Sequence, residues 1–398
     1  MKTRPNPRFV RTEFASFTGA PPYTVTGMRA RKGLNRTVFF PTISAFATDY
    51  KLHNTYLKPD FITDPLEEYW TMRKVAGLWD VTGEEIIEVK GKDAEALLDD
   101  LMPRDVRKMK DGHAYYSVLC YDYGGIVEDG ILARFDAQNF WWIGGPGSSE
   151  EWLYVNAQGR DVTVTSYNDR IHTASLQGPK SREILQQVCD TDLSKVPFYG
   201  LFRGKICGVP VTVTRTGYTA ELGYDIYVDV AHGEKFFADL WDHSRKAGSA
   251  LCGSKALGIR RIEAAILNFT QDFDYQHTPA DIGLGWMISE TKAPYRAQAA
   301  LTAAKRNPPK SKLAGLKIEG DEIPLTGDAV MVNGKKVATV TSATGSPTLG
   351  YPIAIAMFNE PDKSVLGTPV TVQMDDHTAK AHVVAMPFLD PERKLSKA

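Results

Sequence analysis

The alternation of apolar and polar positions is clearest between residues 211 and 230, which read VTVTRTGYTAELGYDIYVDV. Before Gly217 and again after Gly223, β-branched and aromatic residues recur at every second position, which is the period of a β-strand. The two glycines bracket a tight connection, where a residue without a Cβ is favoured. The pattern therefore predicts a long hairpin with two carboxylates, Glu221 and Asp225, near its turn.

The remaining patterns predict a chain of mixed helices and strands. Segment 37–56 is rich in aromatic residues and is expected to be extended. Asp64-Pro65 has the cap and first-turn proline of a helix start. Apolar spacing predicts helices over 94–101, 150–157, 179–188 and 233–246, and strands over 84–89, 115–135 (a pair), 140–143 and 161–166.

A linker and a β-rich unit follow. Residues 307–312 read NPPKSK, a composition typical of a connection between domains. Beyond it, short strands with turns at Asn333-Gly334 and Ser346-Pro347 predict a small barrel or sandwich.

Composition narrows the function classes. A net charge of −1 argues against a broad nucleic-acid surface, and no apolar run is long enough to span a bilayer. The four cysteines form no CxxC motif and read as reduced thiols, so a cytoplasmic location is expected. The first 36 residues are basic and rich in proline, which favours an extended arm packed on the body over a targeting peptide.

Several ordered segments resemble the glycine-cleavage T-protein family. RTGYTAELGYDIYV (215–228) resembles the family segment RTGYTGEDGFEI. YSVLCYDYGGIVED (116–129), LQGP (176–179) and the run from 261 to 286 match further family motifs in the same order. SATGSPTLG (342–350) and MPFLDP (386–391) extend the match almost to the end of the chain.

The resemblance implies an α+β, three-domain folate-binding fold with a C-terminal β-barrel domain. Residues 1–305 would form a folate-binding catalytic region of two interleaved subdomains, and residues 311–392 the barrel, lying against the folate site. The implied cofactor is tetrahydrofolate.

The resemblance also assigns site residues. Asp129 lies where the family has its catalytic aspartate, although Asp129 or Glu128 could instead be a turn acid. Asp225 lies where the family has a glutamate that holds the pterin; it is one methylene shorter, and Glu221 is the alternative. Tyr218, Tyr116 and Phe198 match aromatic residues of the folate site.

The motifs indicate less clearly to which branch of the family the chain belongs. The family motifs DVSHM and GARD become DVTGE (80–84) and KALG (255–258), and Gly145 stands where an asparagine is expected. LWDV (78–81) and MPRD (102–105) resemble more the tetrahydrofolate-dependent demethylase branch, which includes dimethylsulfoniopropionate demethylase. Demethylation of a small methyl donor, giving 5-methyl-tetrahydrofolate, is therefore expected.

Two alternatives remain open. The first is an aminomethyltransferase that works with a lipoyl carrier protein and gives 5,10-methylene-tetrahydrofolate. The second is a folate-binding assembly factor without catalysis, which is disfavoured because the KGCYxGQE-type motif is absent.

Other candidate residues have a structural and a functional interpretation. Trp141 and Trp142 could form one wall of an aromatic box that binds a methylated cation, with Tyr115, Tyr121 and Tyr123 nearby. The favoured interpretation is that the two tryptophans are ordinary core residues. His53 and His277 could donate protons, but structural roles are favoured. The spacing of the eight histidines predicts no metal site.

Overall fold

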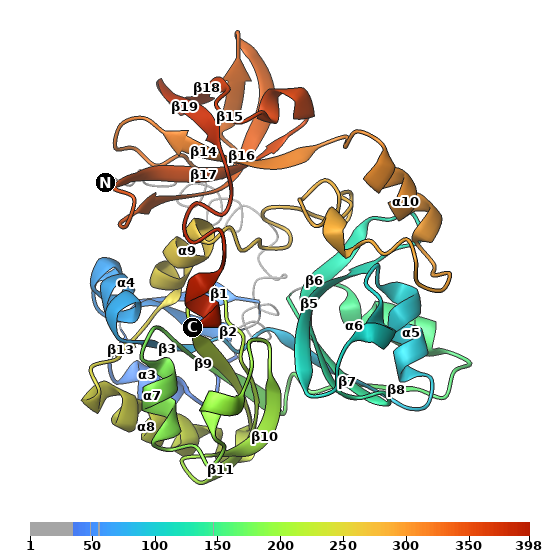
Figure 1. The fold of residues 1–398 in the computed structure, drawn as a ribbon. Coiled ribbons are helices and arrows are strands. Elements are labelled where there is room, and N and C mark those ends of the chain that lie inside the picture. Colours follow the sequence, from blue (N-terminus) through green and yellow to red (C-terminus); the bar gives the residue numbers. More distant parts are fainter. Residues whose placement is uncertain (1–34, 48, 55, 146) are drawn as a thin grey trace, which may run out of the picture.

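The structure is a computed structural model that describes residues 35–47, 49–54, 56–145 and 147–398. Two sheets and a closed barrel surround a common centre, with helices on the outer faces of the sheets (Figure 1). This arrangement confirms the predicted α+β fold class with a C-terminal barrel. The basic arm lies almost wholly outside the described residues.

A six-stranded sheet has the order β10-β11-β12-β9-β3-β13. All neighbouring strands are antiparallel except β13 and β3. The predicted hairpin is present as β11 and β12, joined by residues 215–222. The strands are β3 (Gly77–Asp80), β9 (Ile171–Gln177), β10 (Leu201–Ile206), β11 (Val209–Thr214), β12 (Gly223–Asp229) and β13 (Ala250–Leu251).

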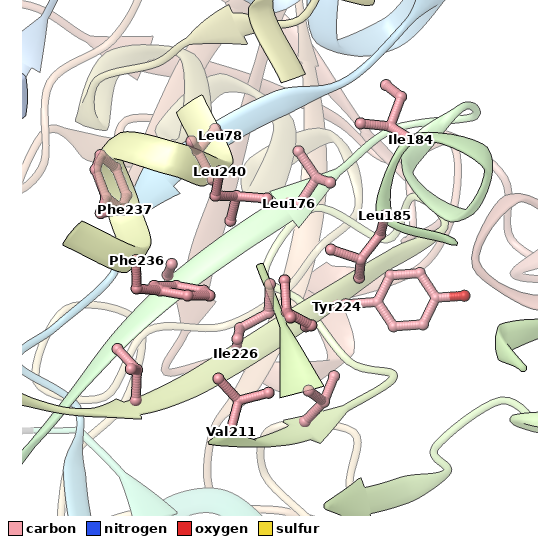
Figure 2. Close-up of a cluster of buried hydrophobic side chains, with 14 of the residues drawn as sticks. Leu78, Leu176, Ile184, Leu185, Val211, Tyr224, Ile226, Phe236, Phe237 and Leu240 are labelled. Atoms are coloured by element: carbon pink, nitrogen blue, oxygen red, sulfur yellow. The ribbon is translucent and has the colours of Figure 1, made fainter. Parts of the chain in front are cut away.

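Two helices cover one face of this sheet and form its core. Helix α8 (Val230–Lys246) places Phe236, Phe237 and Leu240 against Leu176 of β9, while α7 (Ser181–Gln186) adds its own leucine and isoleucine side chains (Figure 2). Apolar side chains three and four residues apart share one face of α8, so the helix seals the sheet along its length.

A five-stranded antiparallel sheet has the order β5-β6-β7-β4-β8. The apolar sides of α5 (Ala94–Leu101) and α6 (Ser149–Ala157) share a core with it. Its strands are β4 (Glu85–Lys90), β5 (His113–Cys120), β6 (Ile126–Asp136), β7 (Asn139–Gly144) and β8 (Thr163–Ser166).

The chain crosses between the two sheets twice. Strand β3 belongs to the six-stranded sheet and β4 to the five-stranded sheet, so residues 81–84 form the first crossing. The chain returns between β8 and β9. Val81 and Glu84 of the first crossing line the cavity described below.

The C-terminal barrel closes in the order β14-β17-β16-β15-β18-β19. Asn333 and Gly334 both have positive φ angles between β15 and β16, the conformation of the predicted tight hairpin turn. The strands are β14 (Lys312–Ile318), β15 (Ala329–Val332), β16 (Lys335–Ser346), β17 (Tyr351–Phe358), β18 (Pro369–Gln373) and β19 (Thr378–Val384).

The segment before the first sheet differs from its prediction. A five-residue helix, α3 (Phe40–Ser44), interrupts the stretch expected to be extended, because Phe39 and Ile43 are one turn apart and both pack into the core of the six-stranded sheet. The hairpin of β1 (Asp49–His53) and β2 (Tyr56–Phe61) follows. Helix α4 (Pro65–Lys74) begins as predicted, since the Asp64 carboxylate accepts from the backbone N–H groups of residues 66 and 67.

Buried polar contacts join the barrel to helix α9 (Ser254–Glu263). Glu263 accepts hydrogen bonds from Tyr69 of α4 and from Ser346 of β16, at 2.5 Å for the latter. Arg261 donates to Ser342 of β16 at 2.7 Å and pairs with Asp272. Buried polar groups are costly to leave unpaired, so these contacts hold the barrel in one orientation.

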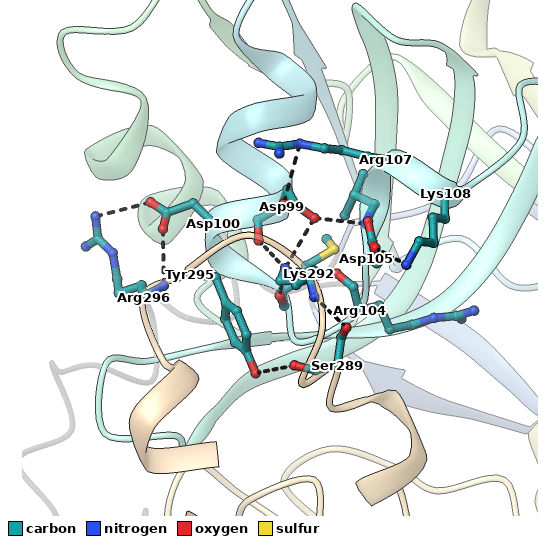
Figure 3. Close-up of polar contacts among 12 residues, drawn as sticks. Asp99, Asp100, Arg104, Asp105, Arg107, Lys108, Ser289, Lys292, Tyr295 and Arg296 are labelled. Carbon is teal, nitrogen blue, oxygen red and sulfur yellow. Dashed lines mark hydrogen bonds and ion pairs between the residues drawn. The ribbon is translucent and has the colours of Figure 1, made fainter. Parts of the chain in front are cut away.

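The segment between residues 287 and 297 leads to helix α10 (Gln298–Arg306) and is held by one lysine. The Lys292 ammonium contacts the side chain and carbonyl of Asp99 at the end of α5 and the carbonyls of Met102 and Arg104 (Figure 3). The last helix, α11 (Lys394–Lys397), lies near the middle of the view in Figure 1, and Arg215 of the hairpin loop donates a hydrogen bond to the carbonyl of its Ser396.

Candidate functional site

A cavity of about 1420 Å³ lies where the two sheets and the barrel meet. Its wall includes Asp129 from the five-stranded sheet, Asp225 from the six-stranded sheet and Thr344 from the barrel. Small-molecule sites commonly span about 300–1000 Å³, so this space can hold a large ligand together with a second small one. The barrel thus lies against the candidate site, as expected.

All six residues assigned from the resemblance line this cavity, although they come from five separate segments of the chain. They are Tyr116, Asp129, Phe198, Tyr218, Glu221 and Asp225. The fold therefore brings the predicted site residues together, while their individual roles stay predictions.

Asp129 and Glu128 are neighbours on β6 whose carboxylates have different partners. The Asp129 carboxylate lines the cavity and accepts a hydrogen bond from the Tyr116 hydroxyl at 2.8 Å. Burial raises the pKa of Asp129 to about 7, against the opposing effect of that hydrogen bond. Glu128 instead accepts from Ser149 and from the backbone N–H of Gly147, so it holds the loop after β7.

Asp225 has hydroxyl donors on both carboxylate oxygens. Ser175 of β9 donates to one oxygen at 2.6 Å and Thr216 donates to the other at 2.7 Å. Burial raises the pKa of Asp225 and these two hydrogen bonds oppose the rise. Each oxygen keeps a second lone pair, so the carboxylate remains able to accept two N–H donors from a ligand.

Glu221, the alternative to Asp225, pairs with two arginines. Its carboxylate pairs with Arg260 at 2.8 Å and also with Arg73. Glu221 and Arg260 are both buried, and removing either partner would leave the other charge uncompensated. This ion pair joins α4 and α9 to the hairpin loop beneath the cavity.

The aromatic residues differ in how they reach the cavity. The Tyr218 hydroxyl donates to the carbonyl of Leu267 at 2.7 Å, which fixes its ring on the wall. Phe198 packs edge-on against Tyr199, with 4.5 Å between ring centroids, and both line the cavity.

Two charged features of the wall were missed from the sequence. Glu84, at the crossing from β3 to β4, lines the cavity, and burial together with the charges of Asp225 and Asp129 raises its pKa to about 8. Lys58 of β2 forms a buried ion pair with Asp80 on the same wall. The departure of residues 80–84 from the family motif could have marked Glu84 as a site residue. Lys58 could not be found in this way, because only the folded β1–β2 hairpin brings it to the cavity.

The proposed aromatic box around residues 115–142 is wrong. Trp142 is fully buried and donates to Ser149, and Trp141 packs with aromatic residues on the opposite face of the sheet. The favoured core interpretation of the tryptophan pair is confirmed. The five residues of the box do not line the cavity: Tyr115, Tyr121, Tyr123, Trp141 and Trp142.

The two candidate histidines are not placed to donate protons. His53 is exposed at the end of β1, where it lines the cavity, and partial desolvation there with the charges of Lys58 and Lys51 lowers its pKa, so it is neutral near pH 7. His277 pairs with Asp274 at 2.9 Å and does not line the cavity. The pairing with Asp274 supports a structural role for His277, while the role of His53 stays a prediction.

Within residues 35–47, 49–54, 56–145 and 147–398, no group of three histidine, cysteine or acidic side chains could hold a metal ion. In the same part of the chain, no helix has both the length and the apolar character needed to cross a bilayer. All four cysteines are free.

Comparison with known proteins identifies the family. Residues 27–292 match the GCVT N-terminal domain, and residues 312–390 match the glycine cleavage T-protein C-terminal barrel domain. The chain belongs to the glycine-cleavage T-protein family. Proteins of this family use tetrahydrofolate, and the resemblance seen in the sequence motifs is thereby confirmed.

Relatives within the family have different names. An aminomethyltransferase of Alkaliphilus oremlandii is 32% identical over 81% of this chain and 88% of its own length. A trimethylamine-oxide aldolase of Ruegeria pomeroyi is 31% identical over 95% of this chain, which spans 50% of that relative. The crystal structure of aminomethyltransferase T from Bartonella henselae has a TM-score of 0.83, with 23% identity over 89% of this chain and 98% of its own. This last likeness establishes the fold.

Proposed function

We propose that the protein transfers a one-carbon unit to tetrahydrofolate by demethylating a small methylated substrate, with 5-methyl-tetrahydrofolate as the product. The observation that carries this proposal is the convergence of Asp129, with its raised pKa, and Asp225 on one large cavity. A carboxyl group that titrates near neutral pH is suited to proton transfer.

Five of the predicted site residues have a role in this proposal. Asp225 accepts hydrogen bonds from the N–H groups of the pterin, while Tyr218, Tyr116 and Phe198 supply aromatic surface beside it. Asp129 accepts the proton that the folate nitrogen releases when its bond to the transferred carbon forms. The acidic and aromatic lining and the volume of the cavity fit a pterin ring with its aminobenzoyl extension.

The donor is expected to be a sulfonium or ammonium compound first and a methoxy compound second. A methyl group leaves readily from sulfur or nitrogen that carries a positive charge, because the leaving group departs neutral. An ether oxygen needs protonation before it leaves, so a methoxy substrate would depend on an acid such as the Glu84 carboxyl group, whose pKa burial raises to about 8. The position of the donor beside the folate nitrogen would provide much of the rate.

Aminomethyl transfer is the second candidate. The name of the relative from Alkaliphilus oremlandii supports aminomethyl transfer more directly than it supports demethylation. In that case the partner is a lipoyl carrier protein. Support for demethylation comes from the cavity wall, where Glu84, Gly145 and Lys255 all differ from the T-protein motifs. An assembly role without catalysis has the least support.

One experiment distinguishes the candidates. The pure protein is incubated with tetrahydrofolate and a panel of methylated sulfonium, ammonium and aryl ether compounds, and the folate product is identified by mass. Formation of 5-methyl-tetrahydrofolate supports demethylation. Formation of methylene-tetrahydrofolate, only when an aminomethylated lipoyl carrier protein is supplied, would replace it with aminomethyl transfer.

Folate binding has its own test. Asp225→Ala should weaken tetrahydrofolate binding by about 1.5–3 kcal/mol, because charged hydrogen bonds to the pterin are lost. Isothermal titration calorimetry measures the effect, with circular dichroism as a check on folding. Unchanged affinity would remove Asp225 from the site.

A further inference from the structure

We propose that Glu84 is a specificity-determining residue whose carboxylate binds the positive charge of the methyl donor, so that the site prefers cations to neutral molecules of the same shape. This inference rests on the proposed function and defines its substrate class. It places the binding of the cation at an acidic site, away from the aromatic residues 115–142 that the sequence offered as a possible box.

The position of Glu84 exposes its carboxylate to the cavity. The residue ends the crossing that leaves β3 and enters β4, so it lies between the two sheets rather than within either. Asp225 and Asp129 both act electrostatically on it. Across the described ranges, no group donates a hydrogen bond to the Glu84 carboxylate and no cation lies within ion-pair distance of it, although it lines the cavity.

Among the described residues, no ion pair joins Glu84, Asp129 or Asp225 to a cation, although Lys51, Arg215, Lys255 and Arg393 also line the cavity. Asp129 and Asp225 have only hydroxyl groups as side-chain donors. The nearby cation, Lys58, is paired with Asp80, and Arg261 across the cavity is paired with Asp272. Acids without a cationic partner in an enclosed space favour a positively charged ligand, since attraction is stronger there than in water.

Aromatic rings beside these acids suit the same ligand. Tyr227 and Tyr218 line the cavity, and the charge of Glu84 acts on both. The Tyr218 hydroxyl is directed to the carbonyl of Leu267, which leaves part of its ring available to the ligand, whereas Tyr227 is buried against Trp141 and offers little ring surface. A methylated onium ion exposes apolar methyl groups that carry positive charge, and it is attracted to both rings and carboxylates.

Binding of a cation should release a proton. Burial and the charges of Asp225 and Asp129 raise the pKa of Glu84 to about 8, and Lys58 opposes the rise. Near pH 7 the carboxyl group is therefore largely protonated before the donor enters, and a bound cation lowers its pKa again. Cation affinity should consequently increase with pH up to about 8, which a purely structural role would not produce.

The adjacent residue provides a matched control. Glu85 is also a carboxylate whose pKa burial raises to about 8, but Glu128, Glu150 and Glu151 act on it and it does not line the cavity. Glu84→Gln and Glu85→Gln thus remove the same kind of titratable carboxyl group one residue apart, on different sides of the chain.

The test uses choline and its neutral carbon analogue, 3,3-dimethylbutan-1-ol, as probes. Binding of each probe is measured by saturation-transfer NMR and calorimetry, with and without tetrahydrofolate, in the wild type and both variants. We expect choline to bind the wild type at least about tenfold more tightly than the neutral analogue. Glu84→Gln should remove most of that preference and of the proton release, while Glu85→Gln keeps both.

The possible results separate this inference from the proposed function. Equal binding of the two probes to the wild type, or an unchanged preference in Glu84→Gln, overturns the role of Glu84. Loss of tetrahydrofolate affinity in Glu84→Gln with an intact choline preference also overturns it and assigns Glu84 to the pterin. If tetrahydrofolate fails to bind the wild type while Glu84 still selects the cation, the proposed function fails and the role of Glu84 stands. The comparison of probes in the wild type does not depend on the folding of any variant.

Discussion

Asp129 and Glu128 show how adjacent carboxylates acquire different chemistry. Successive side chains of a strand point to opposite faces, so Asp129 faces the cavity while Glu128 holds the loop after β7. Burial raises the pKa of both. Only Asp129 can meet a ligand in the cavity, and its pKa of about 7 allows it to exchange a proton near neutral pH.

The exchange of Asp129 for asparagine tests that role. Asp129→Asn keeps the shape of the side chain and its contact with Tyr116, so the fold and folate binding should persist. Turnover should fall by about two orders of magnitude. In the wild type, activity should rise with pH through about 7 as Asp129 loses its proton. This rise of activity with pH should be absent in the variant. Normal turnover in Asp129→Asn would show that the aspartate is only structural.

Stability should also depend on the charge of Glu84. Because its pKa is raised in the folded state to about 8 from 4.5, the folded protein holds a proton that the unfolded chain releases, and stability falls as pH increases between those values. Glu84→Gln removes this effect. The measured quantity is the melting temperature of Glu84→Gln minus that of the wild type. This difference should be about 1–3 °C larger at pH 9 than at pH 5. The exposed Glu151→Gln is the control, and a pH-independent difference for Glu84→Gln would contradict the raised pKa.

At the scale of elements, one buried lysine fixes the segment that leads to α10. Lys292 reaches the C-terminal end of α5 and contacts the Asp99 side chain and three backbone carbonyls (Figure 3). Carbonyls at the end of a helix lack partners within the helix, so a cation is favoured there. Trp286, six residues before Lys292 in the chain, lines the cavity. The contacts of Lys292 therefore help to position part of the cavity wall.

Lys292→Met should destabilise the protein strongly. The substitution leaves Asp99 and the carbonyls without their buried partner, which typically costs about 3–5 kcal/mol. Lys246→Met, at an exposed position of α8, should change stability by less than about 0.5 kcal/mol. Urea unfolding compares the two, and equal effects would show that the Lys292 contacts contribute little.

At the scale of the whole molecule, the barrel is part of the site rather than an appendage. Thr344 and Met386 line the same cavity as Asp129 and Asp225. The buried contacts of Asp272 with Thr341, at 2.7 Å, and with Ser342 join the barrel to the rest of the protein independently of the linker.

Cleavage of the linker tests this arrangement. A specific protease site inserted between Pro309 and Lys310 should allow the chain to be cut while both parts remain together on gel filtration. Asp272→Ala leaves Arg261 without its buried partner and should weaken the association by about 3–5 kcal/mol. Separation of the cleaved wild-type parts would show that the linker, and not the buried contacts, holds the barrel.

The sequence by itself determined most of the elements. The hairpin of β11 and β12, the start of α4 and the turn at Asn333-Gly334 follow from local rules, namely side-chain alternation, a capping aspartate and two residues that tolerate positive φ. The ordered motifs also identified the family. Local prediction failed at α3, where packing of Phe39 and Ile43 against the six-stranded sheet outweighs the extended tendency of the segment.

Tertiary structure alone decided how the acids are used. Glu221 and Asp225 are four residues apart and equally acidic in sequence, yet Glu221 pairs with Arg73 and Arg260 while Asp225 meets only hydroxyl groups. Glu84 becomes a cavity residue because the chain changes sheets at that point. The protonation of a carboxyl group depends on burial and on charges brought from distant segments, and no local pattern in the sequence contains that information.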